Sequence, residues 1–109
     1  MRTSTTLAFC FCIGLAASAQ AQDKVAAGQK VFTDQKCGVC HSVGDKGNKK
    51  GPMEGVAGKL SETDLRAWIT DAKGMTAKTK ATRKPEMKAY ALPKEEVDDL
   101  VAYLQTLEK

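Results

Sequence analysis

The five residues Cys37-Gly38-Val39-Cys40-His41 constrain this chain more than any other stretch of its sequence. Cys37 and Cys40 are the only cysteines beyond Cys12, and His41 is the single histidine of the chain. Two thiols followed directly by an imidazole form the C-x-x-C-H pattern of covalent haem attachment. With one helical turn between them, the thiols can reach neighbouring vinyl groups on one porphyrin edge, and the next residue places its imidazole under the iron.

Zinc binding and disulfide exchange are two other chemistries that use closely spaced cysteines. A structural zinc site needs about four protein ligands, and Cys37, Cys40 and His41 supply fewer. A disulfide-exchange enzyme would carry its C-x-x-C near a βαβ pattern, and no stretch of this chain alternates like a strand. A bond between Cys37 and Cys40 would close almost no loop and would stabilise the fold little. The motif therefore favours haem attachment.

The N-terminal segment is typical of a secretory signal peptide. Arg2 gives a positive start, an apolar run extends from Leu7 to Ala17, and small residues lead to Ala19 and Ala21. The run is shorter than the roughly 20 residues that span a bilayer, so cleavage is favoured over a retained membrane anchor. We expect cleavage after Ala21, with Ala19 as the alternative site, and export to the periplasm as a soluble monomer. The expected domains are the signal peptide, residues 1–21, and one mature domain, residues 22–109.

The charge of the mature chain is mild in sum and uneven in distribution. The full chain has a formal net charge of +4, and loss of Arg2 with the signal lowers it by one. This charge is too weak to indicate a nucleic-acid binder. Residues 73–88, here called the basic segment, carry Lys73, Lys78, Lys80, Arg83, Lys84 and Lys88 against Glu86 alone. Residues 95–108 carry Glu95, Glu96, Asp98, Asp99 and Glu108 and no basic residue. We expect a basic side and an acidic side.

Three stretches of the mature chain have apolar residues at helical spacing. The first holds Val25, Gly28, Val31 and Phe32, with Asp23 as a cap in front. The second begins at Ser61 with Asp64 as its capping-box partner, carries Leu65, Trp68, Ile69 and Ala72 on one face, and stops at Gly74. The third runs from about Pro93 to the end, with Val97, Leu100, Val101 and Leu104 facing the core. Residues 42–60 and 73–92 are expected to be loops, so the fold class is all-α with long loops.

Three short helices with long loops make a thin core for a domain of this size. Domains this small commonly need a disulfide, a metal or a cofactor to be stable. Phe9 and Phe11 leave with the signal peptide, which reduces the aromatic content further. A large, flat, apolar cofactor in the middle of the domain would supply the missing core.

With the C-x-x-C-H motif in this setting, nearly all of the mature sequence resembles the class I c-type cytochromes. The resemblance implies a small all-α domain with three main helices and long loops around one covalently bound haem c and its iron. Gly28 and Phe32 are similar to the family's packing pair in the first helix, which Leu100 and Tyr103 of the last helix would cross.

The resemblance also implies roles for residues near the haem. His41 would be one axial ligand of the iron. Gly51-Pro52 resembles the family's loop whose proline carbonyl accepts the ring N–H of that histidine, so Pro52 is expected to support the cofactor there. Trp68 resembles the tryptophan of the family's middle helix, which lines the haem pocket.

The sixth iron ligand is expected to be a thioether, because the chain has no second histidine. Met53 follows His41 closely, in the loop expected on the histidine side of the haem, and should be unable to reach around. Met75 comes directly after the expected end of the second helix. The family's axial methionine lies in a proline-containing loop shortly before the last helix, and Lys84-Pro85-Glu86-Met87 matches that loop. The resemblance therefore implies Met87, with Met75 and an open site as the alternatives.

The function that the resemblance implies is electron transfer between respiratory redox partners, and not enzymatic catalysis. Histidine and methionine ligation raises the reduction potential of a haem iron and leaves no vacant position for a substrate. The basic segment would steer the protein toward acidic docking surfaces, such as those of a membrane oxidase or reductase. An open sixth position would instead indicate a protein that binds or senses a small gas. An electron-accepting subunit held in one enzyme complex is a further alternative.

Overall fold

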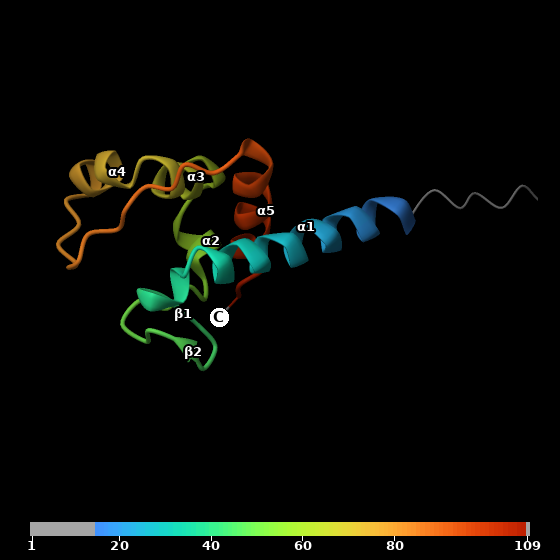
Figure 1. Cartoon of the computed structure of the whole chain (residues 1–109), viewed down its shortest axis with the longest axis horizontal. Helices are drawn as coiled ribbons and strands as arrows, with labels where there is room; N and C mark the ends of the chain where they lie inside the picture. Colours follow the sequence, from blue (N-terminus) through green and yellow to red (C-terminus); the bar gives the residue numbers. More distant parts are fainter. Residues whose placement is uncertain (1–14, 109) are drawn as a thin grey trace, which may run out of the picture.

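The computed structural model describes residues 15–108, which form a mostly helical domain (Figure 1). Its helices are α1 (Leu15–Asp34), the 3-10 turn η1 (Cys37–Val39), α2 (Val56–Lys59), α3 (Glu62–Thr70), α4 (Ala72–Thr79) and α5 (Lys94–Gln105). Two short antiparallel strands, β1 (Ser42–Val43) and β2 (Lys46–Gly47), pair Ser42 with Gly47 and Val43 with Lys46. The all-α fold class is confirmed, with α1, α3 and α5 as the three main helices.

The helices α1 and α5 cross in direct backbone contact at Gly28 (Figure 1). A Cβ added to Gly28 would lie 2.6 Å from the carbonyl carbon of Asp99 and 2.7 Å from the Cβ of Tyr103. One turn further along α1, the rings of Phe32 and Tyr103 meet edge to face, with centroids 5.8 Å apart. The predicted packing of this glycine and phenylalanine against the last helix is therefore confirmed.

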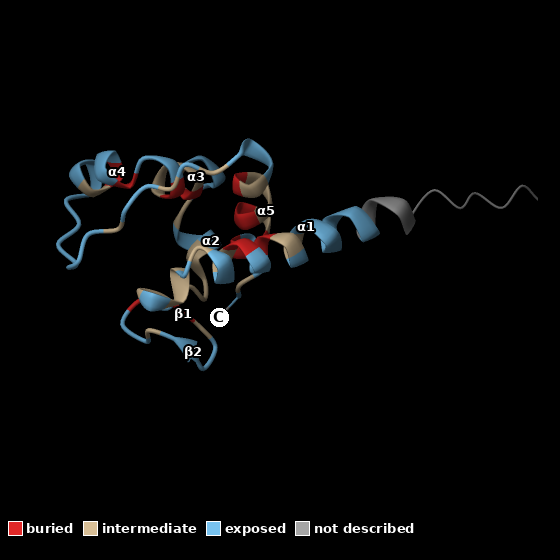
Figure 2. Cartoon of the chain, in the orientation of Figure 1, coloured by how far each residue is buried: buried red, intermediate tan, exposed pale blue. Residues whose placement is uncertain are grey.

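The hydrophobic core lies where α5 meets α1 and α3 (Figure 2). Its buried members are Val31 from α1, Leu65 and Ile69 from α3, and Val97, Leu100, Val101, Tyr103 and Leu104 from α5. A charged pair also ties two of these helices, because the Arg66 guanidinium on α3 binds Asp98 on α5. The stripe predicted for the third helix and two members of the second stripe, Leu65 and Ile69, thus form one core, whereas Trp68 is only half-buried and Ala72 lies on α4.

The second predicted helix is two helices in the structure. It begins as expected, because the Ser61 hydroxyl accepts a hydrogen bond from the Asp64 N–H at 3.1 Å and caps α3. The predicted stop at Gly74 is wrong. The chain breaks earlier, at Asp71, whose carboxylate accepts from the Gly74 N–H at 3.2 Å and caps the start of α4. Gly74 therefore lies in the first turn of a helix in a segment predicted to be a loop.

The first helix begins earlier than predicted, because α1 runs without a break from Leu15 through Asp23. Asp23 is therefore not a cap in this chain. The predicted cleavage after Ala21 falls within α1, and the helix would then keep only its residues from Gln22 onward. The rest of the predicted signal peptide, residues 1–14, lies outside the described residues. No helix in the described part of the chain is both long and apolar enough to cross a membrane.

Both predicted loop regions are anchored to the helices by backbone hydrogen bonds. In the first, which also contains the strand pair and α2, the Gly55 N–H donates to the Leu107 carbonyl at 2.8 Å beyond the end of α5. In the second, the Tyr90 N–H donates to the Ile69 carbonyl at 2.8 Å on α3. These two bonds hold the first loop against the residues that follow α5 and the second loop against α3.

Replacing Gly28 with alanine should destabilise the protein strongly, because the new methyl group would overlap the backbone of α5. We expect the free energy of unfolding to fall by about 1–3 kcal/mol, the usual range for overpacking a tight contact. Chemical denaturation followed by circular dichroism would measure the change.

Gly58→Ala is the matched control, since an added Cβ at Gly58 on α2 would meet nothing within 4 Å. This variant should be neutral or more stable than the wild type by up to about 1 kcal/mol. Equal stability of the two variants would show that α1 and α5 do not touch at Gly28.

Candidate functional site

A large cavity opens between the C-x-x-C-H motif, α3, α5 and the loop that follows α4. Its volume is ≈ 700 Å³, within the range of about 300–1,000 Å³ that is usual for pockets of small molecules and cofactors. Its apolar walls come from Phe32, Val56, Leu60, Leu65, Ile69, Leu100 and Leu104. The structure also brings Cys37, Cys40, His41, Trp68 and Met87 together around this one space. Of the site residues predicted from the sequence, only Pro52 does not line it.

The local backbone explains how the motif reaches the cavity. Helix α1 ends at Asp34, and Lys36 turns the chain with a φ of 57° before η1 begins. The His41 N–H then donates to the Cys37 carbonyl at 2.9 Å, so the motif forms one compact turn. Cys37 and Cys40 are both free thiols and both half-buried. Two thiols and an imidazole therefore lie on one short turn at the cavity wall.

His41 is held by a carbonyl on the loop after β2. Its Nδ1 donates to the carbonyl oxygen of Gly51 at 3.2 Å, which leaves Nε2 as the nitrogen that can bind a metal. The predicted acceptor, the Pro52 carbonyl, is therefore wrong by one residue. Pro52 is exposed, and instead forms a parallel bridge with Ser42 that holds the loop beside the motif.

Burial lowers the pKa of His41; the hydrogen bond to Gly51 opposes this shift, and the nearby Arg83 guanidinium adds to it. A lowered pKa keeps the imidazole neutral, which is the form that binds a metal ion. The site therefore presents His41 in the right protonation state and with its ring orientation fixed.

The pKa of the Cys37 thiol is raised, mainly by burial, with a further contribution from Cys40. Disulfide-exchange enzymes do the opposite, because they lower the pKa of the attacking cysteine to obtain a thiolate. The burial of Cys37 therefore disfavours this residue as the attacking thiol of a redox-exchange enzyme.

The structure distinguishes the three methionines considered as iron ligands, Met53, Met75 and Met87. Met87 is half-buried and lines the cavity from the loop between α4 and α5. Met53 also lines the cavity, but its N–H donates to the Ser42 carbonyl at 2.9 Å, which places it directly beside His41. Met75 is only 5% exposed on α4 and lies outside the cavity lining. Met87 is thus the methionine that faces the cavity from a segment remote from His41.

Two further residues hold the site together and were not recognised from the sequence. Asn48 bonds to the motif: its side chain donates to the Val39 carbonyl at 3.1 Å and its N–H to the His41 carbonyl at 3.0 Å. Arg83 lines the cavity and donates to the Cys40 carbonyl. The basic segment marked Arg83 only as a charge, and nothing in the local pattern around either residue indicated its distant partner.

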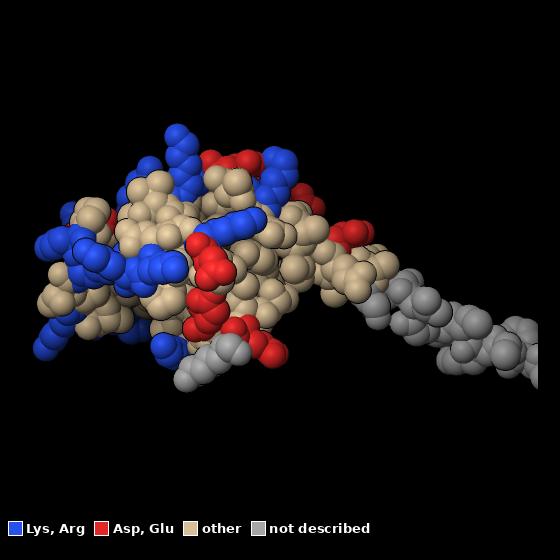
Figure 3. All heavy atoms as spheres, turned by 90° about the horizontal axis from the view of Figure 1, so that it is seen from below, with Lys and Arg blue, Asp and Glu red and all other residues tan. Residues whose placement is uncertain are grey.

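Basic side chains form part of the cavity lining. Lys50, Arg83 and Lys84 contribute to its lining. In Figure 3, Lys and Arg side chains gather at the end of the molecule remote from the start of α1. The acidic character of α5 is weaker than its sequence suggested, because Asp98 pairs with Arg66 and with Lys94.

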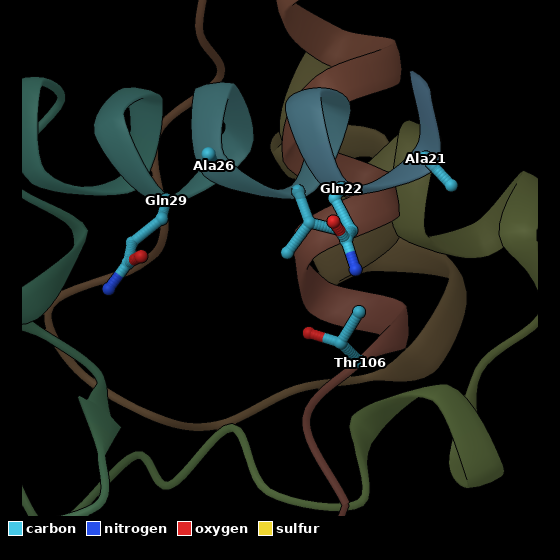
Figure 4. Close-up of a pocket in the computed structure, with 6 residues that line it drawn as sticks. Ala21, Gln22, Ala26, Gln29 and Thr106 are labelled. Carbon is cyan, nitrogen blue, oxygen red and sulfur yellow. The ribbon is translucent and has the colours of Figure 1, made fainter. Parts of the chain in front are cut away.

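A second hollow, of ≈ 370 Å³, lies between the N-terminal half of α1 and the end of α5 (Figure 4). It is lined by Ala21, Gln22, Val25, Ala26, Gln29 and Thr106. This lining contains no thiol, imidazole or charged group, and the predicted cleavage would remove Ala21. The cavity beside the motif is therefore the better candidate for the functional site.

The residues of the larger cavity fit a haem well, since they combine apolar walls, two thiols for covalent attachment and an imidazole with one free nitrogen. Comparison with known families gives a match between residues 25–108 and the family model described as "Cytochrome c". Neither the curated proteins nor the solved structures compared with the chain gave a match.

The purified holoprotein should carry one haem on Cys37 and Cys40. Its intact mass should exceed that of the mature polypeptide by one haem, and extraction with acidified organic solvent should leave the colour with the protein. A variant in which both cysteines are replaced by alanine should release any bound haem in the same extraction. Free haem extracted from the wild type would contradict thioether attachment.

Proposed function

The chain belongs to the cytochrome c family, and from this premise we propose that it is a freely diffusing carrier of single electrons between respiratory redox partners. Its cofactor is a covalently bound haem c with its iron. As a member of this family it is a haem-based electron-transfer protein. The proposal adds the periplasm as its compartment, because residues 1–21 have the sequence pattern of a secretory signal peptide.

The observation that carries the proposal is the convergence of His41 and Met87 on one apolar cavity. In this proposal, His41 through Nε2 and Met87 through its sulfur would hold the iron. When bound, the haem supplies a one-electron redox centre, whose reduction potential this ligand pair raises. If both side chains bind the iron, no position would be left for a substrate, so we propose a carrier and not an enzyme.

The walls of the cavity also affect the properties of the redox centre. Trp68 and Leu65 from α3 and Leu100 from α5 line it with apolar surface, which limits the access of water to the iron. A dry, apolar surrounding lowers the reorganisation needed when the charge of the iron changes, and it adjusts the reduction potential. The two cysteines are half-buried, and Val39 between them is 68% exposed. The C-x-x-C-H turn is therefore the part of the cavity wall that borders solvent.

The basic segment supports docking to an acidic partner. Arg83 and Lys84 lie both in this segment and in the lining of the cavity, so the positive charge borders the redox centre. Charges placed there steer a partner toward the haem and raise the association rate more than the affinity. We propose that the partner is a membrane oxidase or reductase with an acidic docking surface in the same compartment.

Met87→Leu should lower the reduction potential and let added carbon monoxide bind the ferrous iron, because the sixth ligand is lost. The matched control is Met75→Leu, which conserves side-chain volume in a buried site and should change neither property. A redox titration followed by visible spectra would measure the potential and the methionine-to-iron band together. If wild-type protein binds carbon monoxide as readily as Met87→Leu, the iron has an open position and gas binding becomes the better function.

Replacing Lys80, Lys84 and Lys88 together with glutamate should slow oxidation by respiratory membrane vesicles by about tenfold or more at low salt, because the steering charge is reversed. The difference from wild type should shrink as salt rises, since screening confines such interactions to about 8 Å at physiological ionic strength. Stopped-flow spectroscopy would give the rates.

The control variant reverses the same number of charges at Lys24, Lys30 and Lys59, none of which lines the cavity. It should oxidise at a rate close to wild type at every salt concentration. A wild-type rate that does not change between low and high salt would rule out charged docking.

A further inference from the structure

Arg83 forms a contact that joins two distant parts of the site. It lies in the loop between α4 and α5, and its guanidinium donates a hydrogen bond to the backbone carbonyl of Cys40. Cys40 belongs to the C-x-x-C-H turn, next to His41, and precedes Arg83 by 43 residues. The bond therefore connects the loop that carries Met87 directly to the turn that carries the other axial ligand.

The place of the guanidinium is shaped by a glycine. A Cβ added to Gly51 would lie 2.9 Å from Cζ of Arg83 and would also overlap the Cys40 carbonyl oxygen. Any other residue at this position would push Arg83 away from its acceptor. The Gly51 carbonyl is also the one that holds the His41 ring. The contact thus joins three segments: the C-x-x-C-H turn, the loop after β2 that contains Gly51, and the loop between α4 and α5 that contains Met87 (the Met87 loop).

The Met87 loop has few other attachments. Within the described chain, its backbone is bonded at the two ends, from the Ala81 N–H to the Thr76 carbonyl and from the Tyr90 N–H to the Ile69 carbonyl. Between these ends, the side-chain contacts of Lys84 with Glu86 and of Lys88 with Tyr90 stay within the loop or at its end. The Arg83 bond is the one hydrogen bond found there that ties residues 82–89 to another part of the described chain.

We propose that Arg83 is a positioning residue for Met87, the proposed sixth ligand of the iron. By binding the Cys40 carbonyl, Arg83 holds the Met87 loop closed over the cavity. The proposal rests on the assignment of Met87 as that ligand. To leave the iron, Met87 must move with its loop, and that movement breaks the Arg83 bond. The bond therefore lowers the population of the open state, in which an external ligand can reach the iron.

This role differs from a general effect of positive charge. Lys84 is the neighbouring cation, it also lines the cavity, and its ammonium group pairs with Glu86 inside the same loop. Removal of Lys84 would take away the same charge from nearly the same place without breaking a contact to the motif. Arg83 and Lys84 therefore form a matched pair that separates the hydrogen bond from the charge.

The test is an imidazole titration of the ferric holoprotein, because imidazole must displace the methionine before it binds. The apparent dissociation constant varies inversely with the open population. We expect Arg83→Ala to bind imidazole about tenfold more tightly than wild type, equivalent to about 1.4 kcal/mol. Arg83→Lys, which keeps one donor, should recover part of the difference. Lys84→Gln should stay within about twofold of wild type.

Met87→Leu and the double variant Met87→Leu with Arg83→Ala complete the experiment. Both should bind imidazole tightly and equally, because without Met87 the loop no longer carries a ligand of the iron, and the Arg83 bond then has no ligand to position. If Arg83→Ala has the wild-type affinity while Met87→Leu binds more tightly, Arg83 is not the positioning residue, although Met87 is the ligand. If Met87→Leu itself has the wild-type affinity, the ligand assignment fails. An equal effect of Arg83→Ala with and without Met87, or of Lys84→Gln and Arg83→Ala, would also overturn the proposal.

Discussion

The direct backbone contact between α1 and α5 is the constraint on which the rest of the fold depends. Gly28 allows Asp99 and Tyr103 of the last helix to approach with no side chain in between. The thiol motif follows α1 after a short turn, and the Met87 loop leads directly into α5. The crossing of these two helices therefore fixes where the thiol motif begins and where the Met87 loop ends. The remaining loops connect these two segments.

The cavity and the hydrophobic core share the same side chains. Leu65, Ile69, Leu100 and Leu104 are members of the buried cluster and also line the cavity. Each of them packs on one side against protein and on the other against the space for the haem. Because burial of apolar surface contributes roughly 25 cal/mol per Å², a porphyrin in this space would add substantially to a small core. The cofactor is therefore a structural part of the domain as well as its redox centre.

Local sequence patterns predicted the three main helices and the C-x-x-C-H motif, and the family resemblance supplied the other site residues, but neither predicted how these parts are connected. Gly28 was identified at the helix crossing through the resemblance to the class I c-type cytochromes, and the close approach of α1 and α5 explains why a glycine stands there. The predicted stop at Gly74 was wrong, since glycine often ends a helix and the competing cap at Asp71 lies one turn earlier. The acceptor for His41 was predicted one residue too late, at Pro52. The hydrogen bond from Arg83 to the Cys40 carbonyl was not predicted, because the position of a backbone carbonyl depends on the tertiary fold and not on any residue type.

The pairing of the first and last helices has a consequence for the order of events if the chain is exported as proposed. A chain translocated N-terminus first presents Cys37 and Cys40 well before residues 94–105 emerge. Until those residues arrive, Gly28 has no partner helix and the core cannot form, because contacts between distant parts of a chain form slowly and late. During such an export, the thiols would remain accessible until the last helix has emerged. The topology itself provides the interval in which a bulky planar group can be joined to the chain before the domain closes around it.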